Sequence, residues 1–408
     1  MTGFPGRLPR STHLARMGVT MAIALAVFLS TPALAAAKTL YVSLKGKNTA
    51  ACTKSAPCKT IGAAVSKAAK GDTVDVARGT YREQVILTKD ISLVGTGKPL
   101  IDATGQSNGV LIKGPGADGA LLRGFVVEHA TLEGILAVSA AHLTIEGNTV
   151  RNNDLGIKAA KPIGECAPSQ GAPGDCGEAL HLMSVTHSLV TGNTVKDNVG
   201  GILLTDELGP TADNTISHNT SLDNVLDCGI TLAGHNPKAT ANGKPQPKVA
   251  GVYGNKILDN VSNGNGTKGE GAGILMGGGA PGAGVYDNLI EGNTANDNGL
   301  AGITIHSHFF GPGAPAADLN GNQVIDNTVS HDGVADSPSE AEFSKTDFGK
   351  NTTVGILVGS DVVILKGIVI RANTIRDTHF GIWTKNDGNK VSAKKNAFHN
   401  VKVKVKQT

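Results

Sequence analysis

The 408-residue chain has few aromatic side chains, little net charge and few cysteines. Phe, Tyr and Trp make up 3 % of the residues, whereas Gly occurs 54 times, a balance that suits narrow stacked coils better than a helical bundle. The formal net charge is only +3, so the composition demands neither a nucleic acid nor an acidic polymer as partner. After the first 37 residues, no apolar run approaches the roughly 20 residues that span a membrane.

Residues 1–37 have the pattern of a secretory signal peptide. Three arginines precede an apolar stretch at Met17–Leu29, and Ala33-Leu34-Ala35 is a small-x-small cleavage site. A membrane anchor is the alternative, but the apolar stretch is shorter than the roughly 20 residues that an anchor needs. We therefore expect a secreted or periplasmic protein with no membrane attachment after cleavage.

Five cysteines suit an oxidising compartment. Cys52 and Cys58 lie in one predicted loop and Cys166 and Cys176 in another, so each pair could close a local disulfide. Cys228 is left over and directly precedes a predicted strand, which indicates a buried thiol.

Short apolar segments of one type recur through the middle of the chain. They read Ala179-Leu-His-Leu, Gly201-Ile-Leu-Leu, Gly229-Ile-Thr-Leu, Gly273-Ile-Leu-Met and Gly302-Ile-Thr-Ile. A motif that recurs at intervals of about 20–50 residues indicates a solenoid, and a single strand per motif indicates a parallel β-helix. Asn-rich turns accompany these strands, and because Asn tolerates left-handed backbone angles we expect their side chains to stack as an internal ladder. The predicted ladder residues are Asn148, Asn193, Asn219, Asn255, Asn293, Asn327 and Asn373.

A predicted helix over Lys59–Lys70, with apolar residues at helical spacing, precedes the repeats and ends at Gly71. This segment, flanked by Pro57-Cys-Lys-Thr-Ile and Gly79-Thr-Tyr-Arg-Glu, resembles the N-terminal cap of secreted right-handed β-helix proteins. With the repeated Gly-Ile-x-Leu strands, the chain resembles the pectate-lyase-like superfamily. The resemblance implies an all-β right-handed parallel β-helix solenoid with an N-terminal capping α-helix. We divide the chain into a signal peptide (1–37), a cap with first coils (38–97) and a β-helix with loop insertions (98–408).

The fold hosts lyases, hydrolases, epimerases, esterases, phage spikes and adhesins, so the resemblance is specific for fold and weak for function. Its enzymes mostly bind a polysaccharide in a groove along the outer face, which makes a polysaccharide the expected partner. The Asp-Pro-His-Asp signature of alginate epimerases is absent. Asp206, Asp227 and Gly234-His235 echo parts of the polygalacturonase pattern, but the paired Asp and the Arg-x-Lys are missing. The sequence carries no signal of oligomeric state.

The strand register predicts the site, because alternate side chains of a strand point to opposite faces. Counting from the strand-start Gly, positions one and three are apolar and face the core. Positions two, four and six are then expected to face solvent, on neighbouring coils about 4.8 Å apart. The polar residues at positions four and six, or at the edge of that patch, are the predicted catalytic residues, namely His235, His306, His308, Glu207, Asp206 and Asp227.

The leading expectation is a polysaccharide lyase, since His can act as base or acid in β-elimination. The predicted substrate-binding residues are Lys158, His181, Glu178 and Trp383. Either Lys158 or a cation such as Ca²⁺ on Asp206 and Glu207 could neutralise a uronate. Trp383 is predicted to face outward, where its ring could stack on sugar or be covered by a loop.

Three alternatives remain open. A glycoside hydrolase could use Asp206, Glu207 and Asp227 as its carboxylate pair, with Glu178 and Glu270 as further candidates. His235, His306 and His308 have ligand types for zinc or copper. A non-catalytic carbohydrate-binding or cell-surface β-helix is the alternative of a different class.

Overall fold

The computed structural model describes residues 36–153, 178–268, 271–307, 311, 313–334, 353–360, 365–385 and 395–408. Residues Ala37–Thr408 form one compact unit, separate from Met1–Ala36. Several predicted features lie outside the described residues: the signal segment up to residue 35, the Cys166 and Cys176 loop, Lys158, Glu270 and His308.

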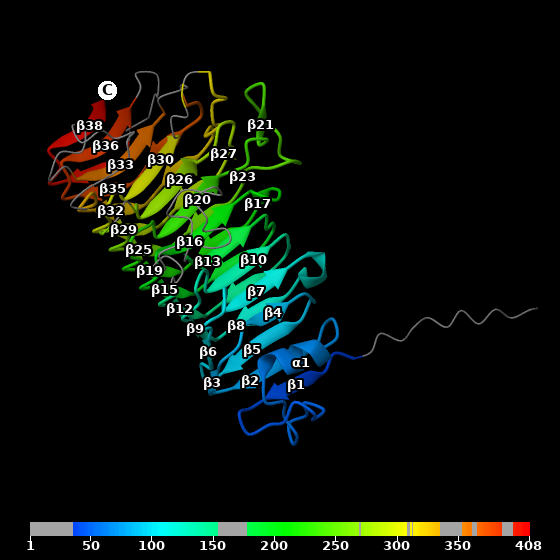
Figure 1. The fold of residues 1–408 in the computed structure, drawn as a ribbon. Coiled ribbons are helices and arrows are strands. Elements are labelled where there is room, and N and C mark those ends of the chain that lie inside the picture. The colour runs from blue at the N-terminus through cyan, green and yellow to red at the C-terminus, as the bar shows by residue number, and fades with distance from the viewer. Residues whose placement is uncertain are drawn as a thin grey trace, which may run out of the picture. The chain divides into compact units, whose positions relative to one another are not determined.

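Three parallel sheets of 11 strands each, called sheets A, B and C, run along the unit Ala37–Thr408 (Figure 1). Sheet A contains β1 (Thr39–Val42), β2 (Thr73–Ala77), β5 (Ser92–Thr96), β8 (Leu121–Arg123), β11 (Thr144–Glu146), β14 (Leu189–Thr191), β18 (Thr215–Ser217), β24 (Lys256–Leu258), β28 (Leu289–Glu291), β31 (Gln323–Ile325) and β34 (Val369–Arg371). Sheet B contains β3 (Thr80–Tyr81), β6 (Leu100–Asp102), β9 (Val126–Glu128), β12 (Thr149–Arg151), β15 (Thr194–Lys196), β19 (Thr220–Leu222), β25 (Val261–Asn263), β29 (Thr294–Asn296), β32 (Thr328–Ser330), β35 (Thr374–Arg376) and β37 (Ala397–His399). Sheet C contains β4 (Val85–Leu87), β7 (Val110–Lys113), β10 (Ile135–Val138), β13 (Glu178–Met183), β16 (Gly200–Thr205), β20 (Ile230–Gly234), β26 (Ile274–Gly278), β30 (Ile303–Ser307), β33 (Val354–Gly359), β36 (Phe380–Lys385) and β38 (Val403–Gln407).

Each coil contributes one strand to sheet A, then one to B and one to C, which confirms the predicted parallel β-helix. At the corner between sheets C and A, three coils add a short strand each, forming a small parallel sheet of β17 (Thr211–Ala212), β23 (Val252–Tyr253) and β27 (Val285–Tyr286). The predicted loop at residues 236–250 carries an antiparallel hairpin of β21 (Thr240–Ala241) and β22 (Lys244–Pro245).

The core follows from strand alternation. In sheets A and B the central residue of a three-residue strand points inward, as Val195 of β15 does between half-buried Thr194 and Lys196. In sheet C the predicted inward residues, such as Ile202 and Leu204, are buried in the same continuous core. Burying one such aliphatic side chain contributes about 1.5–3 kcal/mol, and the stack repeats this gain on every coil.

Three ladders of polar side chains line the corners between the sheets. The ladder between A and B contains Asn148, Asn193, Asn219, Asn260, Asn293, Asn327, Asn373 and Asn396. The ladder between B and C contains Asn153, Asn198, Asn224, Asn265, Asn298 and Asp332. The ladder between C and A contains Ser188, Asn214, Asn255, Asn288 and Asn322.

One rung shows why Asn recurs. The backbone N–H of Asn219 donates to Asn260 Oδ1 at 2.9 Å, and its Nδ2 donates to the carbonyl of Val190 at 2.9 Å. The ladder was predicted, but two details were wrong. Asn255 belongs to the ladder between C and A, and the left-handed angle falls on the residue before each Asn, such as His218 at φ 54°. Asn is used here for its amide rather than for its backbone freedom.

The capping helix α1 spans Ile61–Lys67 and lies at the N-terminal end of the stack (Figure 1). It is shorter than predicted and packs its buried Ile61, Ala64 and Val65 against the core near β1, β2 and β4. Glu83 accepts the backbone N–H groups of Ile61 at 2.9 Å and Gly62 at 2.8 Å, which suits the positive end of the helix dipole.

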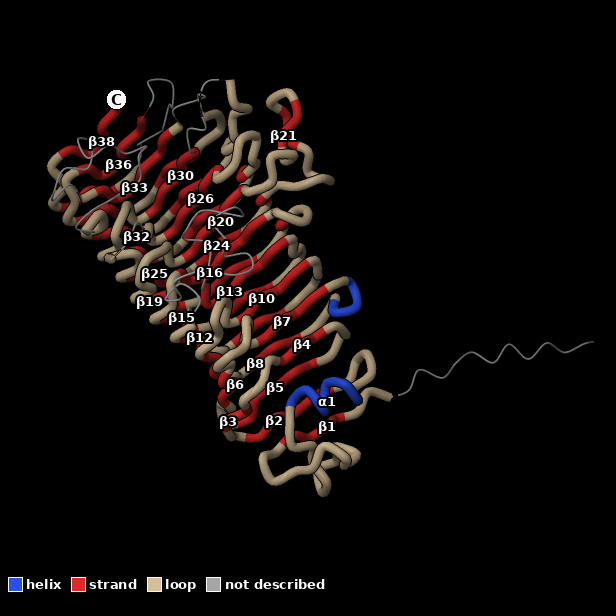
Figure 2. Tube along the Cα trace, in the orientation of Figure 1, coloured by secondary structure: helices blue, strands red, loops and turns tan. Residues whose placement is uncertain are grey.

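A disulfide joins Cys52 and Cys58, as predicted, and Cys228 is buried. Apart from α1 and the 3-10 turn η1 (Pro115–Ala117), the described residues form strands and loops (Figure 2). Within the described ranges, no helix is long and apolar enough to cross a membrane.

Candidate active site

The outer face of sheet C is buried from β10 to β36, unlike the outer faces of sheets A and B. One outward column runs along the strands as Leu136, His181, Leu203, Thr231, Leu275, Thr304, Leu357 and Trp383. Every side chain in this column is 9 % exposed or less. We expected the outward residues of this sheet to face open solvent, and for this column that is wrong. The side chains point away from the core, but other parts of the chain cover them.

The predicted register is confirmed up to the strand ends. Thr205, Ala233, Gly277 and His306 pair in order on β16, β20, β26 and β30. Glu207 and His235 lie beyond the ends of β16 and β20, in the bends that follow. Their contact therefore depends on the path of two turns rather than on strand alternation.

These two bends bring together a polar group formed by Asp206, Glu207 and His235. His235 Nδ1 lies 2.7 Å from Glu207 Oε1, within hydrogen-bonding distance. Asp206 Oδ1 accepts the backbone N–H of His235 at 2.7 Å and of Asn236 at 3.0 Å. Asp206 Oδ2 and Glu207 Oε2 are buried and have no hydrogen-bond partner among the described residues. The second bend is thus anchored on Asp206.

Their surroundings give the neighbouring carboxyl groups of Asp206 and Glu207 different pKa values. Burial raises the pKa of Asp206 to about 6, although the N–H bonds from His235 and Asn236 lower it. Burial also acts to raise the pKa of Glu207, but the hydrogen bond and charge of His235, the charge of His181 and a hydrogen bond from Thr205 lower it to about 2. A pair of carboxyl groups with separated pKa values can supply one acid and one base.

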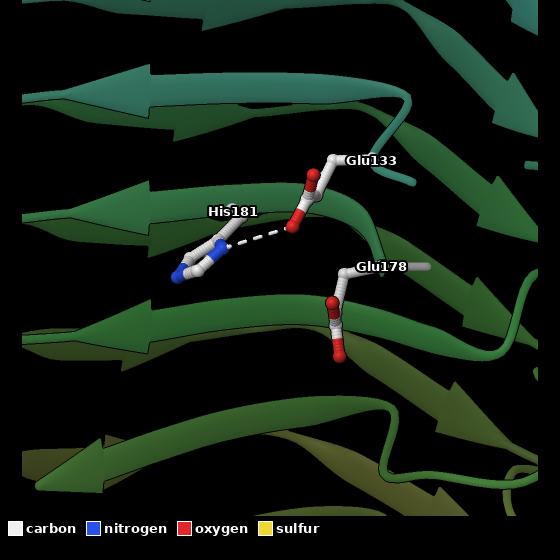
Figure 3. A group of neighbouring side chains, drawn as sticks. All are labelled: Glu133, Glu178 and His181. Atoms are coloured by element: carbon white, nitrogen blue, oxygen red, sulfur yellow. Dashed lines mark hydrogen bonds and ion pairs between the residues drawn. The ribbon is translucent and has the colours of Figure 1, made fainter. Parts of the chain in front are cut away.

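A second group, formed by Glu133, Glu178 and His181, lies further along the same face (Figure 3). Glu133 precedes β10, Glu178 begins β13, and His181 is in the middle of β13. One ligand atom from each of the three lies within 4.8 Å of the others, and each residue is 2 % exposed or less. Glu178 and His181 were predicted as substrate-binding residues, whereas Glu133 was missed.

The sequence contained a signal for Glu133. Ile135 pairs with Leu180, so Glu133 and Glu178 occupy equivalent positions two residues earlier on adjacent coils. Both directly precede a predicted strand start, Gly134 or Ala179. Aligning the residue before each strand start would have placed the two acids side by side.

Asp227 belongs near the second group rather than the first. A Cβ atom on Gly200 would lie 3.3 Å from Asp227 Cβ and 3.3 Å from Glu178 Oε1. Gly200 on β16 therefore separates two carboxylate residues from the coils on either side. Its lack of a side chain leaves room for both.

Thr205 connects the two groups. His181 Nε2 lies 2.8 Å from Thr205 Oγ1, and the Thr205 side chain also hydrogen-bonds Glu207. His181 Nδ1 lies 3.5 Å from Glu133 Oε1. A continuous polar path thus crosses the outer face from Glu133 through His181, Thr205 and Glu207 to His235.

The structure does not bring His306 into this path. It lies three strand spacings from Thr205, or about 14 Å, and two spacings beyond Ala233. Its Nδ1 instead lies 3.1 Å from Thr304 Oγ1, and it is buried. The predicted convergence of His306 with Glu207 is wrong, because Ala233 and Gly277 occupy the intervening coils.

The aromatic candidates are also covered. Trp383 is fully buried, and its Nε1–H donates to Thr408 Oγ1 at 3.0 Å. Lys406 Nζ lies 4.0 Å from the centre of the Trp383 ring. Tyr286 is buried and stacks on Tyr253 with 5.0 Å between ring centres. Neither Trp383 nor Tyr286 offers an open face for a sugar.

Among the described residues, the acidic and histidine ligand atoms that gather within reach of one ion are not those of the predicted metal sites. Calcium takes 6–8 oxygen ligands, whereas Asp206 and Glu207 share no third acidic or histidine ligand among the described residues. Calcium at this pair stays a prediction. In the part of the chain that is described, the group of three acidic or histidine side chains whose ligand atoms lie within 4.8 Å of one another is Glu133, Glu178 and His181. It includes neither His235 nor His306.

Comparison with known proteins gives the fold. A family model described as "Right handed beta helix region" matches residues 97–244. No curated protein sequence matches the chain.

Among solved structures, the catalytic domain of a GH87 α-1,3-glucanase in complex with tetrasaccharides aligns with a TM-score of 0.58 and 16 % identity, over 89 % of this chain and 58 % of that chain. A second structure of a GH87 α-1,3-glucanase domain with tetrasaccharides has a TM-score of 0.52 and 14 % identity, covering 91 % of this chain and 66 % of that one. A rhamnogalacturonan lyase aligns with a TM-score of 0.48 and 14 % identity, over 89 % and 87 % of the two chains.

The chain spans less than two thirds of the length of the two glucanase domains. At these identities the likeness concerns the fold. Taken with the three parallel sheets and the matched family model, it establishes that this chain has the right-handed parallel β-helix fold.

Proposed function

We propose that the chain is a carbohydrate-active enzyme that cleaves a polysaccharide at the outer face of sheet C. The observation that carries the proposal is the Asp206, Glu207 and His235 group, in which two carboxyl groups of separated pKa lie against a histidine. Perturbed pKa values in one cluster are typical of catalytic sites. The α-1,3-glucanase domains, which were solved with bound tetrasaccharides, support a glycan as the class of ligand.

Hydrolysis is the reaction that the charges favour. Strands β10, β13, β16, β20, β26 and β30 contain no Lys or Arg. The same face carries the carboxyl groups of Glu133, Glu178, Asp206, Glu207 and Asp227. An acidic face repels a polyanion, so a neutral glycan is the better substrate.

In this proposal Asp206 is the general acid and Glu207 the general base. Asp206 is held through Oδ1, which leaves Oδ2 to carry the proton that the leaving oxygen takes. Glu207 is ionised over the working pH range and accepts a proton from water, while His235 fixes its orientation.

Elimination on an acidic polysaccharide is the second candidate, and the His235–Glu207 contact favours it. A histidine oriented by a carboxylate can remove the proton beside a uronate carboxyl group. This reaction also needs a positive charge to neutralise the uronate. The six strands that carry the site contain no Lys or Arg, and Lys158, which was predicted for this role, lies outside the described residues.

The test is to incubate the purified chain with neutral glucans, including an α-1,3-glucan, and with uronic-acid polysaccharides. We expect new reducing ends from a neutral glucan without the ultraviolet absorbance of an unsaturated uronate. Reducing ends together with that absorbance would assign elimination instead. Binding without any cleavage would overturn the enzyme proposal in favour of a non-catalytic carbohydrate-binding module.

We also propose that the chain acts in a secreted or periplasmic location, after removal of the N-terminal segment. The Cys52–Cys58 disulfide supports this, since such bonds persist in oxidising compartments. Mass spectrometry of the protein from its native host would test it. The expected N-terminus lies just after residue 35 or 37, and an intact Met1 would contradict the proposal.

A further inference from the structure

We propose that Glu133, Glu178 and His181 bind one divalent transition-metal ion of the zinc type. The inference does not rest on the proposed function, because metal content and affinity are measured without any substrate. It concerns a different group of residues from the Asp206, Glu207 and His235 group.

The spacing of the three side chains suits a metal ion. His181 Nδ1 lies 3.5 Å from Glu133 Oε1, which exceeds the 2.7–3.2 Å usual for an N–H···O hydrogen bond (Figure 3). Two ligands in a tetrahedral zinc site, each about 2.0–2.1 Å from the ion, lie about 3.4 Å apart. Figure 3 also shows Glu178 on the same side of the strands as His181 and Glu133, and all three ligand atoms lie within 4.8 Å of one another.

The contacts of His181 place its Nε2 against Thr205 and its Nδ1 against the carboxylate of Glu133. His181 Nε2 lies 2.8 Å from Thr205 Oγ1, which can accept its N–H. With the ring neutral and Nε2 as the donor, Nδ1 carries a lone pair that faces Glu133 Oε1 at 3.5 Å, so two acceptors face each other. A cation between them resolves the conflict.

The surrounding contacts resemble those that support metal ligands. A metal-bound histidine usually donates its other N–H to a neighbouring acceptor, as His181 does to Thr205. With the Asn108 side-chain amide assigned so that its nitrogen faces Glu133, this nitrogen donates to Glu133 Oε2 at 2.8 Å. One oxygen of Glu133 is therefore held in place while the other faces His181.

The electrostatics also favour a cation. Glu133 and Glu178 are stacked on adjacent coils and are almost fully buried. Two neighbouring carboxylates away from water are costly unless a positive charge accompanies them. A divalent ion held by both carboxylates would supply that charge.

The ligand set selects the type of ion. One imidazole and two carboxylates suit Zn²⁺, whose sites often combine His with Glu, while Ca²⁺ prefers six or more oxygens. Mn²⁺ accepts the same donors less tightly. Asp227, across Gly200 from Glu178, lies near enough to the group to affect its charge.

The test begins with the full chain as purified, without a metal-binding tag. Elemental analysis by plasma mass spectrometry is expected to find about one zinc per chain. After chelation and dialysis, calorimetric titration with ZnCl₂ is expected to show one saturable site, with MnCl₂ weaker and CaCl₂ without effect.

Substitutions then locate the site. Glu178→Gln and His181→Asn are expected to weaken zinc affinity more than about tenfold. Glu146→Gln on sheet A and His187→Asn in an exposed turn are the matched controls and should retain wild-type affinity. If a cluster variant does not fold, Thr205→Val is the milder change, because it keeps the side-chain shape but removes the acceptor of His181.

Two outcomes would overturn the proposal. One is wild-type protein with no bound zinc and no saturable titration, with nuclear magnetic resonance showing His181 as an imidazolium paired with Glu133. The other is zinc binding that the cluster variants leave unchanged, which would assign the ion to surface histidines.

Discussion

The outer face of sheet C and the outer faces of sheets A and B differ although the same inner core supports all three. On sheet B, β15 leaves Thr194 and Lys196 half-exposed on either side of one buried valine. On the next strand of the same coil, all six residues of β16 are buried. The inward residues of all three sheets pack in the same way, so the outward residues can differ in polarity and burial from one sheet to another. In this chain that freedom places histidines and carboxylates on sheet C and solvated side chains on sheets A and B.

The largest expected contrast between these faces is in catalysis. Asp206→Asn and Glu207→Gln keep the shape of each side chain but remove the acid or the base, so we expect kcat to fall about 10²–10⁴-fold on the cleaved glycan. The same change on sheet A, Glu146→Gln, should leave kcat unchanged. A wild-type rate in both active-site variants would remove these two residues from the mechanism.

A prediction about stability concerns the buried Asn ladders, which support all three sheets. Asn219→Ala removes the acceptor of two donors of Asn193 and the donor to the Val190 carbonyl, all of them buried. Each unsatisfied buried group costs about 1–3 kcal/mol, so we expect a loss of about 2–5 kcal/mol in the free energy of unfolding. Asn396→Ala, at the half-buried end of the same ladder, should cost less. Urea denaturation of both variants measures the difference, and equal losses would contradict a role for burial.

The raised pKa of Asp206 predicts a pH dependence of stability. The folded state, with a pKa of about 6, holds this proton more tightly than the unfolded state, so stability falls as pH rises from about 4 to 6. Asp206→Asn removes this loss, and its gain over the wild type should grow across that interval to as much as about 3 kcal/mol. Thermal unfolding of the two proteins at several pH values tests this. A pH-independent difference would show that Asp206 has an ordinary pKa when folded.

The same group predicts the pH profile of catalysis. A general acid at Asp206 must be protonated, so kcat/KM should decline as pH rises through about 6. Glu207 must be ionised, so activity should be lost only as pH falls towards about 2. A profile that is flat between pH 4 and 8 would exclude Asp206 as the acid.

The smallest expected effect is at the end of a ladder. Asp332 occupies a position that Asn fills on the preceding coils, where its Oδ1 accepts Asn298 Nδ2 at 2.8 Å. Burial raises the pKa of Asp332 well above its ordinary value, so its charged form is disfavoured at neutral pH. Asp332→Asn should therefore stabilise the protein by about 1–3 kcal/mol at neutral pH and by less in acid. Destabilisation at neutral pH would mean that the carboxyl group has a partner that an amide cannot replace.

Some of the site could be predicted from the sequence because strand alternation is a local property. The pairing of Thr205, Ala233, Gly277 and His306 followed directly from the spacing of the repeated strands. The same reasoning failed for His306 as a catalytic partner, since register gives the order of coils but two coils lie between His306 and Thr205. It also missed Glu133, which lies before its strand, where the repeated motif was not aligned.

By itself, the sequence determined the solenoid, its inward residues, the polar ladders and the capping helix, because short-range periodicity and turn chemistry dictate each of them. Only the tertiary structure decided which outward residues are buried and which side chains meet beyond the strand ends. The contact of His235 with Glu207 and the grouping of Glu133 with Glu178 and His181 depend on where neighbouring coils bend and what packs over them. Those are properties of the stacked chain, and no single repeat contains them.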